Sequence, residues 1–111
     1  MDGADSLIQM GQQARMIENI TTHKSARKLA GLAVKHATSG LMSHADGNFD
    51  GAAAHAAQAA AHLKDAARLH VSTIGGETPS AQILDAAHLG GAQQLQQSYV
   101  DSVNEGKKNG R

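Results

Sequence analysis

The fold of this chain is decided by residues 52–70, AAAHAAQAAAHLKDAARLH, in which alanine recurs at helical spacing. A second alanine-rich stretch, residues 26–45, comes before it, and the turn-forming sequence ADGNFD occupies 45–50 between them. This pattern predicts two antiparallel helices joined by a short turn. Because small residues face each other along both helices, their axes can approach to the close end of the ~8–10 Å range.

A further helix is predicted before the hairpin, at residues 6–20. Ser6 with Gln9 has the form of a capping box, and apolar residues follow at helical spacing. The apolar face of this segment is out of phase with that of the next one, so we expect a break at Thr21-Thr22.

A last helix is predicted after Gly75-Gly76 and Thr78-Pro79, which combine a helix stop with a helix start. We therefore expect an all-α, four-helix bundle built around the hairpin. Its helices should lie at about 6–20, 23–45, 49–74 and 79–105. They form a single domain over residues 1–105, followed by a frayed basic tail at 106–111.

The composition limits both the core and the classes of function. Alanine supplies about half of the 41% hydrophobic residues, and Phe49 and Tyr99 are the only aromatic residues in the chain. Alanine buries little area, so at ~25 cal/mol per Å² each helix gains little from burial, and self-association or a partner could supply more. Cysteine is absent, which excludes disulfides and thiolate chemistry.

Charge and the N-terminal sequence point away from membranes. Ten basic and ten acidic residues cancel, so there is no overall field to attract nucleic acid or an anionic membrane. The start of the chain, MDGADSLIQMGQQ, contains no continuous apolar run. We expect a cytoplasmic protein, or a virion component if a phage encodes it.

Seven histidines raise the possibility of a metal site. No His-x-x-x-His or Glu-x-x-His pair occurs, and His55 and His62 lie ~10.5 Å apart along one helix. Across a hairpin turning near residue 48, the pairs His44/His55 and His36/His62 would come opposite each other. These four residues are weak metal candidates; the alternative is half-buried histidines with satisfied nitrogens, whose protonation near pH 6 would loosen the bundle.

A cluster of basic residues marks the first half of the chain, namely Arg15, Lys24, Arg27, Lys28 and Lys35. It could be the footprint of a nucleic acid or an acidic partner, or an ordinary solvated helix face. Helix-turn-helix spacing and base-stacking aromatics are both lacking, so nucleic acid is not the expected partner.

Signatures of catalysis are not found in the sequence. No strand-turn-helix elbow surrounds a serine, and the glycine pairs lack the strand and lysine of a phosphate-binding loop. We therefore predict a non-enzymatic protein with no catalytic residue and no cofactor.

The hairpin turn carries one resemblance to a known family. Residues 47–52, GNFDGA, preceded by Gly40 and followed by Ala59, resemble a single tetratricopeptide-type hairpin, and the MIT domain has a similar turn. The resemblance covers residues 29–62 and departs from the family at His36, where a bulky aromatic residue is expected. It implies a hairpin shape and a peptide-holding groove, and it transfers no functional residue.

Apolar residues outside the hairpin favour interaction as the function. We expect either an interaction surface or simple packing on the hairpin from Met10, Met16, Ile17, Ile20, Leu95 and Tyr99. The predicted function is a structural or assembly protein acting through helix-mediated self-association, for instance in a larger bacterial or viral particle. The alternatives are an adaptor that binds a peptide or helix in a groove beside the hairpin, and a histidine-based metal or pH-responsive module. The partner is then the protein itself or another protein.

Overall fold

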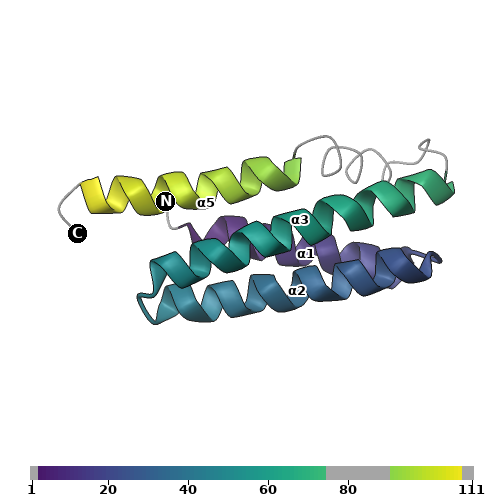
Figure 1. Ribbon diagram of the computed structural model, residues 1–111, viewed down its shortest axis with the longest axis horizontal. Helices are drawn as coiled ribbons and strands as arrows, with labels where there is room; N and C mark the ends of the chain where they lie inside the picture. Colours follow the sequence, from purple (N-terminus) through teal and green to yellow (C-terminus); the bar gives the residue numbers. More distant parts are fainter. Residues whose placement is uncertain (1–2, 75–90, 109–111) are drawn as a thin grey trace.

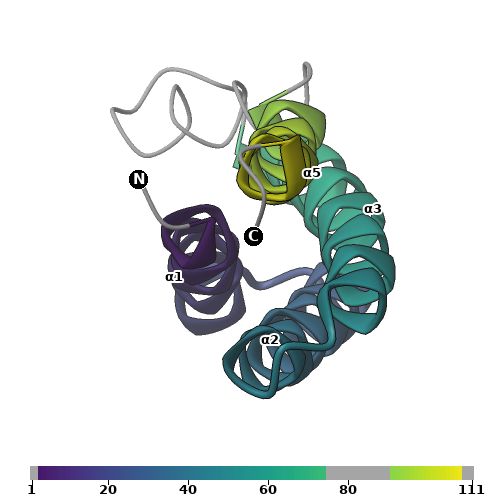
Figure 2. The same cartoon turned by 90° about the vertical axis from the view of Figure 1, so that its left-hand side faces the viewer.

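The computed structural model describes residues 3–74 and 91–108. They form four α-helices, α1 (Ala4–Ile20), α2 (Lys24–Ala45), α3 (Phe49–Ile74) and α5 (Ala92–Lys108), and the described part of the chain contains no strand. The helices lie roughly along one direction (Figure 1). Seen end-on, α2 lies between α1 and α3, and α5 lies across from α2, over the opposite side of α1 and α3 (Figure 2). The predicted all-α, four-helix bundle is confirmed.

The α2–α3 hairpin has the most extensive interface in the bundle. Its inward faces consist almost entirely of alanine, and every alanine predicted to face inward is buried, namely Ala26, Ala30, Ala33, Ala37, Ala52, Ala56, Ala59, Ala60, Ala66 and Ala67. Gly40 lies where three helices meet, since a Cβ at this position would come 3.1 Å from Leu7 Cδ2 and 3.3 Å from His55 Cβ. The absence of a side chain there allows α1 and α3 to approach α2 together.

The turn between α2 and α3 uses the residues predicted for it. Gly47 has a φ of 80°, a conformation that side-chain-bearing residues rarely adopt. The Asn48 side chain accepts a hydrogen bond from the Gly51 N–H at 3.0 Å and so caps the start of α3. The turn therefore ends one helix and starts the next within three residues.

Helix α1 begins earlier than predicted. It starts at Ala4 with Gly3 as its N-cap, and no side chain makes a capping hydrogen bond, so the predicted capping box at Ser6 is wrong. The N–H of Ser6 instead bonds to the Gly3 carbonyl at 3.1 Å. A Cβ at Gly3 would come 3.0 Å from the ring of Tyr99, so the ring occupies the space that a capping side chain would need.

The predicted break at Thr21-Thr22 is confirmed by a three-residue connection between α1 and α2. The Thr21 carbonyl accepts a hydrogen bond from the Arg27 guanidinium at 2.9 Å. His23 caps α2 by accepting the Ala26 N–H on its ring nitrogen Nδ1 at 3.2 Å. These bonds fasten the connection to the first turn of α2.

The bulky part of the core comes mainly from α1 and α5, which cover the alanine-lined hairpin. The largest fully buried side chains are Tyr99, Leu7, Met10, Ile17, Leu63 and Thr21. Only Leu63 of these belongs to the hairpin helices. The packing of α1 and α5 therefore supplies most of the apolar area that a methyl-lined hairpin cannot bury by itself.

Helix α5 coincides with the second part of the helix predicted at 79–105. It starts at Ala92 and extends to Lys108, into the segment expected to be a frayed tail. Helix ends are the least well defined feature of a sequence pattern, because the last turn is lost gradually. The predicted boundary at Gly75-Gly76 and Thr78-Pro79, and residues 79–90, lie outside the described residues.

We predict that Gly40→Val destabilises the bundle by about 1–3 kcal/mol, because two extra methyl groups and a Cβ must displace Leu7 and the Cβ of His55. Urea unfolding followed by circular dichroism measures the change. Gly11→Val, in the middle of α1, is the matched control, because it makes the same change in helix propensity while a Cβ at Gly11 would meet the Cβ of Ala37 at an ordinary 3.6 Å. Equal losses in the two variants would show that Gly40 is not a packing constraint.

We predict that Tyr99→Phe lowers the free energy of unfolding by about 1 kcal/mol. The Tyr99 hydroxyl lies 2.9 Å from His44 Nδ1 and the side chain is fully buried, so the variant removes one partner of a hydrogen bond. A double-mutant cycle with His44→Ala measures the coupling between the two side chains. A coupling energy of zero would contradict a stabilising bond.

Candidate interaction groove and histidine cluster

The six apolar residues predicted as an interaction surface do not lie together on the outside of the bundle. Met10, Ile17 and Tyr99 are fully buried. Met16 and Leu95 are partly buried against the core, whereas Ile20 is 45% exposed. Most of this set therefore packs within the bundle, which was the other possibility left open by the sequence.

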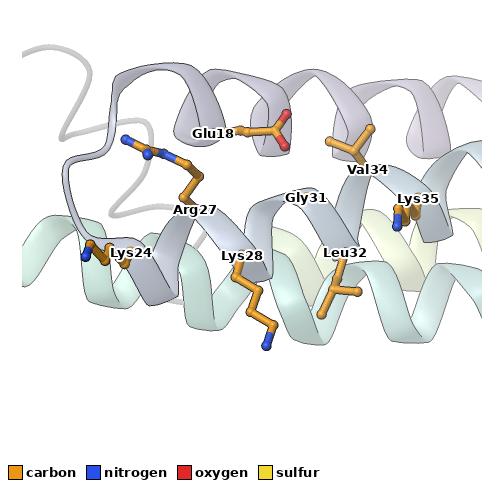
Figure 3. Close-up of a pocket in the computed structure, with 8 residues that line it drawn as sticks. All are labelled: Glu18, Lys24, Arg27, Lys28, Gly31, Leu32, Val34 and Lys35. Atoms are coloured by element: carbon orange, nitrogen blue, oxygen red, sulfur yellow. The ribbon is translucent and has the colours of Figure 1, made fainter.

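A hollow of about 640 Å³ lies between α1 and α2, close to the connection that joins them. It is lined by Glu18, Lys24, Arg27, Lys28, Gly31, Leu32, Val34 and Lys35. Figure 3 shows the basic residues spread along α2 and Glu18 on α1, and a carboxylate oxygen of Glu18 lies over Gly31. We call this surface the basic hollow.

A second hollow of about 190 Å³ continues along the same two helices towards the other end of the bundle. It is mainly apolar and is lined by Leu7, Ile8, Gly11, Gln12, Arg15, Val34, Ala37, Thr38 and Leu41. Val34 lines both hollows, so they adjoin at this residue, and we call the two together the α1/α2 groove.

Glycines allow α1 and α2 to lie close together beneath this groove. A Cβ at Gly11 would be in ordinary contact with the Cβ of Ala37, at 3.6 Å. A Cβ at Gly31 would come 3.1 Å from a carboxylate oxygen of Glu18. The floor is therefore shallow, and the apolar side chain of Ile8 stays 42% exposed at its edge.

Charge in the α1/α2 groove is strongly one-sided. Every residue of the basic cluster seen in the sequence lines it, and Glu18 is the only acidic residue among the lining side chains. Arg27 is held by the Thr21 carbonyl, whereas Lys28 and Lys35 are exposed. The folded chain thus combines basic side chains with an apolar floor, although its net charge is zero.

Three histidines of α2 and α3 come together at the seam of the hairpin. His36 of α2 lies between two histidines of α3: its Nδ1 is 3.1 Å from His55 Nδ1, and its ring stacks on that of His62 with centroids 5.6 Å apart. His36 and His62 thus lie close together, as predicted. His44 instead contacts Phe49 edge-to-face and bonds to Tyr99, so the predicted pair His44/His55 is replaced by His36/His55.

Burial lowers the pKa of His36, and the neighbouring charges of His55 and His62 lower it further. Within residues 3–74 and 91–108, no group of three or more His, Asp or Glu side chains is arranged so that it could hold a metal ion.

One buried histidine was missed in the sequence analysis. His70 of α3 is 2% exposed, and its Nδ1 lies 2.9 Å from the Thr21 hydroxyl, while its Nε2 has no hydrogen-bond partner. Burial lowers its pKa. The sequence contained a signal for this, since His70 follows Leu63 by seven residues and so continues the inward stripe of α3.

Comparison with models of known protein families, with curated proteins and with solved structures finds no match. No helix in the described part of the chain has both the length and the apolar character needed to span a membrane. The hairpin shape implied by the resemblance to a tetratricopeptide repeat is present in α2 and α3.

We predict that the melting temperature decreases progressively as the pH falls below about 6.5. The unfolded chain binds protons at its histidines near pH 6.5. The folded chain resists protonation at His36 and His70, whose pKa values are lowered, so acidification favours unfolding.

Thermal melts between pH 8 and pH 5 measure this effect while most carboxylates stay ionised. His70→Asn keeps a polar group near Thr21 but removes a titrating ring, so its melting temperature should depend less steeply on pH. A melting temperature that stays constant over this range in the unmodified protein would contradict the prediction.

Proposed function

We propose that this protein is a non-enzymatic interaction module whose α1/α2 groove binds an acidic, partly apolar segment of a protein. The observation that carries this proposal is the combination of five basic side chains and one carboxylate with apolar lining residues in two hollows that adjoin at Val34. Complementary charge steers association and selects the partner, and burial of apolar surface supplies affinity.

The dimensions of the groove fit a short helix or an extended peptide. Its lining residues on α2 run from Lys24 to Leu41, a span of ~26 Å along the helix axis. An amphipathic helix of four to five turns has about this length, and it could place apolar side chains over Val34 and Leu41 with acidic ones towards the lysines.

A protein segment accounts for the groove better than a nucleic acid does. Phe49 and Tyr99, the only aromatic residues of the chain, do not line the groove, so it offers no platform for stacking bases. The exposed side chain of Ile8 and the floor at Val34 are instead surfaces that an apolar side chain would cover.

A second candidate function is a pH-responsive module based on the histidine cluster. The contacts of His36 with His55 and His62 across the hairpin seam support it, because protonation of neighbouring rings places like charges side by side. Such a response would act on the same hairpin that forms one wall of the groove.

We expect the protein to bind a labelled synthetic amphipathic helix that carries leucine and methionine on one face and glutamate on the other. Lys28→Glu combined with Lys35→Glu should weaken binding roughly tenfold or more, because it reverses charge at two exposed lining positions. Fluorescence anisotropy measures the affinity. The same peptide with lysine in place of glutamate should not bind.

The matched control is Lys64→Glu combined with Arg68→Glu. This control changes the net charge by the same amount as the groove variant, but both of its residues lie on α3 and neither lines the groove. Both substituted positions are exposed and glutamate is a good helix former, so the groove variant should fold. Equal loss of binding in the two variants, or no binding by the unmodified protein, would overturn the proposed function.

A further inference from the structure

The turn between α2 and α3 exposes large apolar side chains beside carboxylates. Met42 is 65% exposed and Phe49 is 38% exposed, and these are two of the four exposed large hydrophobic residues in the described part of the chain. Asp46 follows α2 as its C-cap, and Asp50 lies in the first turn of α3. We call these four residues the turn patch.

The turn patch and the basic hollow are complementary in charge and in chemistry. The sequence contains no lysine or arginine between Lys35 and Lys64, so the turn lies in a stretch whose fixed side-chain charges are acidic. The basic hollow lies towards the other end of α2 and combines exposed lysines with Leu32 and Val34. An apolar, acidic patch on one surface therefore matches an apolar, basic hollow on another.

Within one molecule these two surfaces cannot meet. Lys35 of the hollow and Met42 of the turn patch are the nearest points of the two surfaces, and they lie seven residues, or ~10.5 Å, apart along the axis of one continuous 22-residue helix. A helix of this length is stiff, and its end cannot fold back onto its own start. The turn patch can fill the basic hollow only of a second molecule.

We infer that the occupant of the α1/α2 groove is the turn patch of a second copy of this chain, so that the protein self-associates head to tail. This inference rests on the proposed function of the groove. Because the two contacting surfaces differ, a pair of copies keeps one free hollow on one copy and one free patch on the other. Contacts of this kind produce open chains, or rings where the rotation between copies closes.

Salt dependence follows from the charges at this interface. Lys28 and Lys35 are exposed, and so is the carboxylate of Asp46, so their attraction acts through solvent and is screened by salt. The apolar contacts of Met42 and Phe49 are not screened in this way. Assembly should therefore weaken with salt without being abolished.

Two variants test the two surfaces separately by sedimentation velocity over a concentration series. The hollow variant carries Lys28→Glu and Lys35→Glu, and the patch variant carries Met42→Gln and Asp46→Asn. Neither patch substitution adds charge, and Asp46 is at a helix C-terminus, where loss of a negative charge is favourable. Circular dichroism verifies that both variants remain helical.

We expect the unmodified protein to form species that grow with concentration and shrink with salt. Each variant alone should associate roughly tenfold more weakly or worse. An equimolar mixture of the two should form dimers that do not grow further, because the intact patch of the hollow variant fits the intact hollow of the patch variant. The control pair Ala61→Gln and Asp65→Asn, exposed or partly exposed on α3, should assemble like the unmodified protein.

The results separate this inference from the proposed function. If the unmodified protein stays monomeric but binds the acidic synthetic helix, the groove functions with another partner and head-to-tail assembly is wrong. If both variants assemble as well as the unmodified protein, copies associate through a different surface and the inference fails. If the protein neither assembles nor binds the synthetic helix, both proposals fail.

Discussion

The short separation of α2 and α3 is the constraint on which the rest of the bundle depends. Apart from the cluster of His36, His55 and His62, the inward faces of the two helices meet mainly through methyl groups and the bare α-carbon of Gly40. Close packing of this kind maximises dispersion contacts but removes little apolar area from water, at ~0.8 kcal/mol per buried CH₂. The hairpin is therefore stable only when larger side chains from α1 and α5, such as Leu7, Ile17 and Tyr99, cover it.

The α1/α2 groove also results from small residues at a helix–helix contact. Gly11 and Gly31 let α1 approach α2 closely, which leaves the outer edges of the two helices as the walls of a shallow trough. The basic residues of α2 lie along that trough because they occupy the solvent-exposed face of the helix, opposite the buried alanine face. Packing and surface chemistry are thus two consequences of one amphipathic helix.

Most of the fold could be predicted from the sequence, because helical periodicity and turn residues are local signals. The alanine stripes, the break at Thr21 and the cap at Asn48 all follow from such signals. The glycine at the start of α1 could not, because the contact that excludes a side chain at Gly3 comes from Tyr99, far away in the sequence.

The candidate site was predictable only in part, because it depends on how helices meet. The basic cluster was visible in the sequence, whereas the apolar floor beside it required the position of α1 relative to α2. Periodicity also does not distinguish an apolar residue that is buried in the core, such as Met10, from one that is exposed on the surface, such as Met42. The partner of His55 depended on the exact alignment of α2 with α3, which periodicity leaves open.

The alignment of α2 with α3 depends on a few residues outside the alanine stripes. A stripe of alanines looks nearly the same after a shift of one helical turn, ~5.4 Å, so the methyl-lined seam contains little information about register. The contacts that would be broken by such a shift are polar: His36 with its two neighbours on α3, and Thr21 with His70 at the far end. Together with the left-handed backbone of Gly47, these few residues distinguish one alignment of the two long helices from the next.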